Sequence, residues 1–181
     1  MNLTIYNFIK NNKIIHKYIC KPQLGNNISP KISWNKVNDT KSYALVFEDP
    51  NAVGHTFIHW YIPYISPDIL EIDQLDMKDI GNFNSLNFDS INLNKIKIFQ
   101  GKNGSKKIGY HGPCAPENSG EHNYIFTIFA LDGILHIDNN IISIYDSNNF
   151  RDILSKNNIN ILNSDTKSFK YRYMNFYSDD N

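Results

Sequence analysis

Three ionisable side chains lie next to the ends of predicted β-strands. Asp49 follows the apolar run 42–48, and His59 stands near the start of the run 57–64 after a nine-residue connection. If the two runs pair as an antiparallel hairpin, Asp49 and His59 lie at the same end of the sheet. His122 directly precedes a third run, 123–131. A carboxylate and two imidazoles at one sheet edge favour binding of an anion or a polar headgroup, since imidazole donates one or two N–H groups.

The loop 109–116 precedes His122 and contains two Gly and two Pro residues. Pro fixes φ and Gly permits close approach of the backbone, so the pattern predicts a stiff loop whose backbone N–H groups can face a ligand. Each feature taken singly is typical of an ordinary capping or hydrogen-bonding group. Their combination at one sheet edge favours a shared ligand.

Short runs rich in Ile, Tyr, Phe and Val between Pro, Gly, Asn and Asp residues predict the elements that position these side chains. This pattern is typical of antiparallel β structure. A roughly helical recurrence of apolar residues predicts one helix late in the chain. Residues 82–107 are polar and are predicted to form a long surface loop. No repeat or linker divides the chain, so a single domain over 1–181 is expected. The predicted strands are 3–8, 14–19, 32–34, 42–48, 57–64, 96–100 and 123–131, and the predicted helix lies within 141–154.

The composition excludes several classes of function. The 181 residues include 18 Lys+Arg and 18 Asp+Glu, so the formal net charge is zero. Nucleic-acid binding is disfavoured because it depends on a basic excess. Only Arg151 and Arg172 are Arg, so a guanidinium clamp on an anion is nearly unattainable. No nucleotide-binding motif or hydrolase elbow is present, and no cofactor is expected. The 41% hydrophobic residues suffice for one sizeable core.

Two cysteines, Cys20 and Cys114, are too few to predict a disulfide framework, and their spacing fits no metal motif. They favour a reducing compartment, with Cys114 as a small residue packed under its loop. The N-terminal residues lack a continuous apolar signal segment, and no run approaches the ~18 apolar residues of a membrane span. The expectation is a soluble, cytoplasmic protein with at most peripheral membrane contact.

Five ordered blocks of residues span positions 29 to 132. They are Ser29-Pro30 with Ile32-Ser33-Trp34, YALVFEDPNA at 43–52, FIHW at 57–60, KIGYHGPCAP at 107–116, and HNYIFTIFALD at 122–132. In order and spacing, these blocks resemble the phosphatidylethanolamine-binding protein family, also called the Raf kinase inhibitor protein family. The residues of the FIHW and KIGYHGPCAP blocks are more similar to those of the bacterial and archaeal branch of the family.

The resemblance implies a mainly β fold, a Greek-key-like antiparallel β-sandwich with a C-terminal helix and a small anion pocket at one end of the large sheet. The family's pocket positions fall on Asp49, His59, His122 and Tyr124, and the pocket rim falls on Gly112 and Pro113. Two departures from the family pattern follow Asp49: Asn51 replaces a second carboxylate, and Val53 replaces a Pro.

The preferred hypothesis is a non-enzymatic binding protein for a phosphate-like or carboxylate anion, with the phosphatidylethanolamine headgroup as its candidate ligand. His59 and His122 would donate to the anion, with affinity rising toward pH ~6. One alternative is a regulator that binds and inhibits a protein kinase or another signalling partner. Another is a metal-dependent enzyme in which Asp49, His59 and His122 form a two-His, one-carboxylate site.

Overall fold

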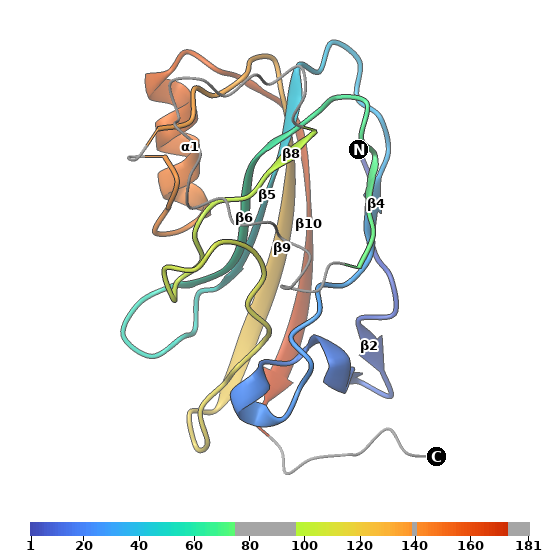
Figure 1. The fold of residues 1–181 in the computed structure, drawn as a ribbon, viewed down its shortest axis with the longest axis vertical. Coiled ribbons are helices and arrows are strands. Elements are labelled where there is room, and N and C mark those ends of the chain that lie inside the picture. Colours follow the sequence, from blue (N-terminus) through green and yellow to red (C-terminus); the bar gives the residue numbers. More distant parts are fainter. Residues whose placement is uncertain (75–96, 139–140, 174–181) are drawn as a thin grey trace.

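The computed structural model describes residues 1–74, 97–138 and 141–173, and its main element is a five-stranded antiparallel sheet (Figure 1). The strand order is β10-β9-β5-β6-β8, so β5 lies at the centre, paired with both β6 and β9. The three strands with the strongest sequence signal are confirmed as β5, β6 and β9. The bounds are β5 Ser42–Asp49, β6 Phe57–Ile65, β8 Ile98–Phe99, β9 Glu121–Leu131 and β10 Ile161–Arg172.

A smaller sheet, in the order β1-β4-β7, lies beside one face of the large sheet (Figure 1). A two-stranded hairpin and two short 3-10 helices follow β1 along the chain. With the helix α1 on the other side, this arrangement confirms the mainly β sandwich with a helix in the C-terminal part. The bounds are β1 Leu3–Ile5, β2 Ile9–Lys10, β3 Lys13–Ile14, η1 His16–Tyr18, η2 Lys21–Gln23, β4 Ile32–Trp34 and β7 Glu71–Ile72.

Every residue of β5 is buried because both faces of this strand are covered. Successive side chains of a strand point to opposite faces. Tyr43, Leu45 and Phe47 join the core shared with the small sheet, whereas Ala44 and Val46 join the core beneath the helix. The same alternation places the last two residues of the strand, both carboxylates, on opposite sides of the sheet.

The helix α1, Ser147–Lys156, packs on the large sheet through Phe150 and Leu154. Asp146 caps its first turn by accepting a 2.7 Å hydrogen bond from the Asn149 N–H. Glu48, at the end of β5, accepts 2.8 Å and 2.6 Å hydrogen bonds from the N–H and Oγ of Ser147. The Glu48 carboxylate therefore has a structural role at the helix N-terminus.

Several sequence predictions of secondary structure are wrong. Within residues 14–19, Ile14 pairs with Ile9 at the end of β3 and the rest form η1 and its flanks, where Tyr18 is buried without strand pairing. The predicted helix begins only at Ser147, where Asp146 supplies the cap. The long strand β10 was not expected, since its alternation runs between half-buried and exposed positions without a strong apolar stripe. Most of the long surface loop predicted at 82–107 lies outside the described residues.

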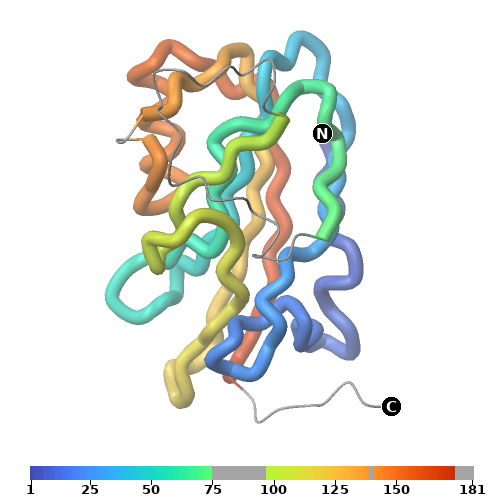
Figure 2. Tube along the Cα trace, viewed as in Figure 1, coloured from blue at the N-terminus to red at the C-terminus, as the bar shows by residue number. Residues whose placement is uncertain are grey.

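Three connecting segments gather in the lower half of the molecule in Figure 2: the loop after β5, the loop before β9 and the segment around η2. The N-terminal segment is tied to the C-terminal strand by the Leu3 N–H, which donates a 2.7 Å hydrogen bond to Asp165 Oδ2. Within the described part of the chain, no helix has the length and apolar character needed to cross a bilayer. Of the residues expected to bind a ligand, Gly112 and Pro113 lie in the loop before β9, whereas the others lie on β5, β6 and β9.

Candidate ligand-binding site

The structure brings Asp49 and His122 together as a buried pair. Asp49 ends β5 and His122 is the second residue of the neighbouring strand β9, and Asp49 Oδ2 lies 2.5 Å from His122 Nδ1. Both side chains are almost fully buried, at 3% and 1% exposure. The other carboxylate oxygen, Oδ1, accepts a 2.9 Å hydrogen bond from the Asn51 N–H. Both oxygens of Asp49 are therefore engaged by the protein.

The second ring nitrogen of His122 is also engaged. Its Nε2 lies 2.8 Å from Ser119 Oγ, and the same hydroxyl donates a 2.6 Å hydrogen bond to the carbonyl of Pro116. Which of Nε2 and Oγ carries the hydrogen of their contact depends on the tautomer of the ring, and both ring nitrogens of His122 are engaged within the protein.

His59, on β6, is held by a two-way contact with the loop before β9. Its Nδ1 lies 2.8 Å from the carbonyl oxygen of His111, and the His111 N–H donates a 2.7 Å hydrogen bond to the His59 carbonyl. Burial lowers the pKa of His59 to about 3, mainly because the charged imidazolium loses its hydration. At neutral pH His59 is uncharged, with its hydrogen on Nδ1 and a lone pair on Nε2. Burial disfavours a charged His59 near pH 6, and the predicted rise of anion affinity toward that pH stays a prediction.

This depressed pKa predicts a pH-dependent contribution of His59 to stability. The unfolded chain binds a proton at His59 below about pH 6.5 and the folded protein does so only near pH 3, so protonation favours unfolding in that window. Relative to a His59→Phe variant, we expect the wild-type free energy of unfolding to fall by up to about 1.4 kcal/mol per pH unit below pH ~6.5. Urea unfolding of both proteins across this window measures the difference. Parallel pH profiles would contradict the burial of a neutral imidazole.

Tyr124 follows His122 by two residues on β9 and lies on the same face of the sheet. Its ring centroid is 5.1 Å from that of His59 and 6.3 Å from that of His122. The hydroxyl is buried, and among residues of the described ranges it has no hydrogen-bond partner. Burial has the largest effect on the pKa of Tyr124 and raises it, and the nearby Asp49 carboxylate raises it further. The backbone N–H groups of Cys114 and Ala115 lower this pKa. Tyr124 is thus a neutral donor without an acceptor.

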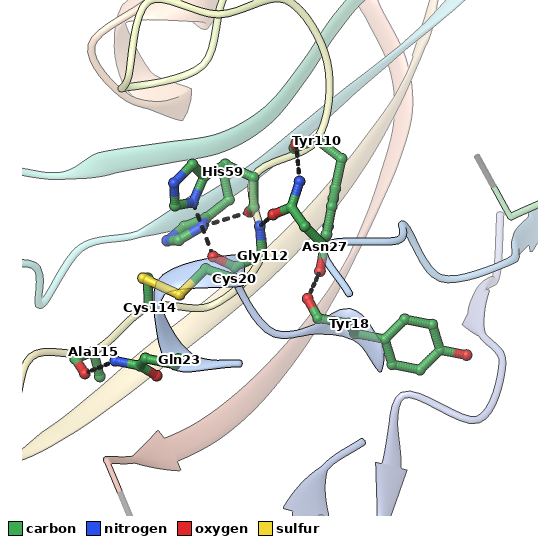
Figure 3. Close-up of a disulfide and its surroundings, with 10 residues drawn as sticks. Tyr18, Cys20, Gln23, Asn27, His59, Tyr110, Gly112, Cys114 and Ala115 are labelled. Atoms are coloured by element: carbon green, nitrogen blue, oxygen red, sulfur yellow. Dashed lines mark hydrogen bonds between the residues drawn. A yellow bond between two sulfur atoms is a disulfide. The ribbon is translucent and has the colours of Figure 1, made fainter. Parts of the chain in front are cut away.

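The loop that contains Gly112 is held to the N-terminal segment through Asn27 (Figure 3). The Gly112 N–H donates a 2.7 Å hydrogen bond to Asn27 Oδ1, and the Pro113 carbonyl accepts a 3.1 Å hydrogen bond from the Cys20 N–H. The Gly112 N–H is therefore engaged within the protein, and a contact of Gly112 and Pro113 with a ligand stays a prediction. A Cβ at Gly112 would lie only 2.3 Å from the backbone oxygen of Tyr18. The glycine is required by this close approach.

A Gly112→Ala variant tests this requirement. We expect it to lower the free energy of unfolding by about 1–3 kcal/mol, because backbone atoms on both sides must move to admit the methyl group. Gly54→Ala is the matched control, since a Cβ there meets no atom within 4 Å and only its positive φ of 89° is strained. Thermal unfolding of the three proteins measures the effect. A Gly112→Ala protein more stable than Gly54→Ala would contradict the close packing of this loop against the N-terminal segment.

Cys20 and Cys114 form a disulfide bond beside this loop (Figure 3). The sequence-based interpretation of Cys114 as an unbridged packed residue is wrong, and the inference of a reducing compartment from two cysteines loses its basis. Sequence distance concealed the pairing: 94 residues separate the two positions. Hydrogen bonds between the two segments, among them those from Tyr110 to Tyr18 and from Gly112 to Asn27, hold Cys20 next to Cys114.

A model of the phosphatidylethanolamine-binding protein family matches residues 4–170 of the sequence. The chain belongs to this family. A relative named UPF0098 protein from Methanothermobacter thermautotrophicus is 37% identical over 139 residues, covering 76% of this chain and 81% of its own. A second UPF0098 protein, from Pyrococcus horikoshii, is 34% identical over 139 residues, which are 76% of this chain and 63% of the relative. These archaeal matches support the branch that the motifs indicated.

Two solved structures of the family share the fold. One is YbcL of E. coli, described as a member of the mammalian PEBP family, with a TM-score of 0.69, 20% identity and coverage of 95% of this chain and 98% of that chain. The other is a PEBP homolog, CT736 from Chlamydia trachomatis, with a TM-score of 0.64, 24% identity and coverage of 95% and 97%. At these identities the likeness concerns the architecture.

The family motifs thus come together in this structure, although some roles differ from those expected. Asp49, His59, His122 and Tyr124 meet at one end of the large sheet, as the strand ends and the resemblance predicted. Sequence reasoning did not assign a role to His111, whose carbonyl fixes the His59 ring and whose own ring lies 5.8 Å from it. Its position directly before Gly112 was the available signal.

The hypothesis of a metal site at Asp49, His59 and His122 does not fit the geometry. Each histidine directs Nδ1 at a protein oxygen, and the second nitrogen of His122 is bonded to Ser119. Over the described ranges, no group of three or more His, Cys, Asp or Glu side chains is arranged to hold a metal ion. Among the four expected side chains, Tyr124 is the one whose buried hydroxyl has no partner within the described ranges.

Proposed function

We propose that the protein binds a small ligand through an anionic, phosphate-like group at the site formed by Asp49, His59, His122 and Tyr124. The observation that carries this proposal is the buried Tyr124 hydroxyl, which has no hydrogen-bond partner among the described residues. Leaving such a group unsatisfied costs about 1–3 kcal/mol, and an anionic oxygen placed against it would recover that cost. Membership of a family of binding proteins supports the same conclusion.

Each surrounding residue has a role in this proposal. Tyr124 donates to the anion, and the backbone N–H groups of Cys114 and Ala115 add positive potential near its hydroxyl. His122 engages the Asp49 carboxylate oxygen Oδ2 and so keeps it from facing the ligand. Gly112 and Pro113 act by holding the loop in place rather than by direct donation. The two candidate ligands are the phosphodiester headgroup of phosphatidylethanolamine, after which the family is named, and a free phosphomonoester.

Removing the Tyr124 hydroxyl tests the proposal. In a Tyr124→Phe variant we expect affinity for inorganic phosphate, measured by calorimetry, to fall at least about tenfold, because a hydrogen bond to a charged group is lost. The free energy of unfolding should rise by about 1 kcal/mol, because an unsatisfied buried hydroxyl is removed. A stabilised variant with unchanged phosphate affinity would refute the role of Tyr124.

Tyr61→Phe is the matched control. Tyr61 also has a buried hydroxyl without a partner among the described residues, but its ring lies on the other face of the sheet, 5.6 Å from that of Phe150 in the helix. We expect a similar gain in stability and no change in phosphate affinity. Equal loss of binding in both variants would indicate a general change in the sheet rather than a contact with the ligand.

Regulation of a protein kinase remains a prediction from the family resemblance. A pull-down with the wild type and the Tyr124→Phe variant tests it, since a partner controlled by the site should respond to the substitution. The absence of enzymatic activity and the cytoplasmic location likewise remain predictions. The disulfide weighs against the cytoplasm, because such bonds persist mainly in oxidising compartments.

A further inference from the structure

We propose that a groove between α1 and the start of β10 binds the carboxyl-terminal residue of a peptide, one with an aliphatic side chain. The groove has a volume of about 440 Å³, within the range in which proteins hold small ligands. It lies on the helix side of the large sheet, and the small sheet lies on the opposite side (Figure 1). Tyr124 belongs to the core on the side of the small sheet, so this second site is independent of the function proposed above.

The first feature of the groove is an arginine with no acidic partner in the part of the chain that the structure describes. Arg151 lines the groove, and its guanidinium carbon lies 4.8 Å from the ring centroid of the buried Phe129. A guanidinium held against an aromatic ring still presents N–H groups along its edge, where they can bind a carboxylate through two parallel hydrogen bonds. The other arginine, Arg172, lies 4.0 Å from Glu121 Oε2. Arg151 is thus the guanidinium available to a ligand carboxylate.

The second feature is an amide whose orientation is fixed by a neighbouring carboxylate. The side-chain Nδ2 of Asn160 donates a 2.7 Å hydrogen bond to Asp132 Oδ2, and the Asn160 backbone N–H donates a 2.7 Å hydrogen bond to Oδ1. These hydrogen bonds lower the pKa of Asp132, so the carboxylate is charged and only accepts at neutral pH. The Asn160 side chain therefore keeps Oδ1 as an acceptor. A ligand that meets this oxygen in the groove must bring an N–H group.

The third feature is an apolar wall formed by Leu154, Ile159 and Ile161. The first two are buried members of the core beneath the helix. Asn158, with a left-handed φ of 55°, turns the chain after the helix, and the Ile159 N–H then donates a 3.0 Å hydrogen bond to the Leu154 carbonyl. The wall is therefore held in place by the end of the helix. It offers an aliphatic side chain a fixed apolar surface.

The three features together select the ligand class. A simple carboxylic acid would meet Arg151 and the apolar wall but would bring no N–H group to Asn160 Oδ1. An internal segment of a peptide would bring the N–H group but no carboxylate. The terminal residue of a peptide carries a carboxylate, an amide N–H and a side chain on one carbon, and capture of a free carboxyl terminus is a known mode of peptide recognition.

The probe for this site is N-acetyl-leucine, titrated into the ¹⁵N-labelled wild-type protein up to about 20 mM and followed by NMR. Its roughly 12 non-hydrogen atoms predict a dissociation constant of about 2 mM at an ordinary ligand efficiency. We expect shifts of the backbone signals at 158–161. N-acetyl-leucinamide lacks the carboxylate and 4-methylpentanoate lacks the N–H group, so each should bind at least about tenfold more weakly.

Variants of the two arginines identify the group that binds the carboxylate. Arg151→Gln should weaken binding at least about tenfold, and Arg151→Lys should give a smaller loss because it keeps the charge but not the planar fork. Arg172→Gln is the matched control, because Arg172 ends β10 and is roughly 35 Å along the strand from Ile161. Tyr124→Phe should also bind N-acetyl-leucine as the wild type does. The amide spectrum of each variant reports whether it is folded.

A longer probe separates a peptide from a free acylated amino acid. The peptide acetyl-Ala-Ala-Leu should bind at least as tightly as N-acetyl-leucine, because Arg151, Asn158 and Asn160 are exposed and leave room for a preceding chain. Weaker binding of this peptide would overturn the assignment to a peptide terminus.

Four further outcomes would overturn the proposal. They are binding of N-acetyl-leucinamide or 4-methylpentanoate as tight as that of N-acetyl-leucine, an equal loss of affinity in Arg151→Gln and Arg172→Gln, wild-type affinity in Arg151→Lys, and unchanged signals at 158–161 at the highest concentration. Each leaves the proposed binding of phosphate at Tyr124 intact, because that site is measured with a different ligand. Loss of phosphate binding in Tyr124→Phe, in turn, leaves this proposal unaffected.

Discussion

Replacing both cysteines, in a Cys20→Ser/Cys114→Ser variant, is expected to lower the free energy of unfolding by roughly 2–5 kcal/mol. The bond closes a loop with a sequence separation of 94, which encloses β4, β5 and β6 and therefore restricts much of the unfolded chain. In the chain-entropy model, a loop of about 100 residues corresponds to the upper part of that range.

Urea unfolding of the oxidised and the dithiothreitol-reduced wild type, alongside the variant, measures this effect. Reduction should shift the wild type to nearly the stability of the variant and leave the variant unchanged. The mass of the intact protein, lower by two hydrogens when oxidised, verifies the bond before each experiment. Coincident unfolding curves for the oxidised and reduced wild type would show that the bond does not form or does not constrain the chain.

An Asp49→Ala variant is expected to lose about 1–3 kcal/mol of stability, because it leaves the buried Nδ1 of His122 without its hydrogen-bond partner. The pair is almost fully enclosed, so solvent screens it little. Asp49→Asn should lose less, since its side-chain oxygen can still accept the hydrogen bond from His122 Nδ1.

A double-mutant cycle with His122→Ala isolates the interaction from other effects of truncation. The double variant should be markedly more stable than the sum of the two single losses predicts. Glu71→Ala is the control, because its ion pair with Lys31 spans 2.7 Å on an exposed surface and should contribute little. Strict additivity at Asp49 and His122 would mean that the two side chains do not form a pair.

The parts of the fold that were predictable share a strong local signal. The strands β5, β6 and β9 are long apolar runs buried on both faces, and β4 follows a Ser-Pro turn. β10 was missed because it packs on one face only and alternates with exposed residues such as Lys167 and Lys170. The 3-10 turn η1 was missed because burial of Tyr18 and Ile19 beside a distant loop resembles a strand in sequence.

The sequence predicted which residues meet at the candidate site. It did not predict the hydrogen bonds that these residues make. Strand ends and family motifs placed Asp49, His59 and His122 together. Which ring nitrogen carries a hydrogen depends on the His111 carbonyl and on Ser119, and these contacts form only in the folded chain. The disulfide was beyond reach for a similar reason, because two cysteines far apart in sequence carry no local sign of proximity.

The two consecutive carboxylates at the end of β5 restrict insertions and deletions within this strand. Glu48 binds the first residue of α1 on one side of the sheet, and Asp49 binds His122 on the other. Because side chains alternate, inserting or deleting one residue within Ser42–Asp49 would exchange the faces of these two residues and damage both contacts. Contacts on both faces of the sheet therefore fix the number of residues in β5. Insertions and deletions should be tolerated only in the turns that flank the strand.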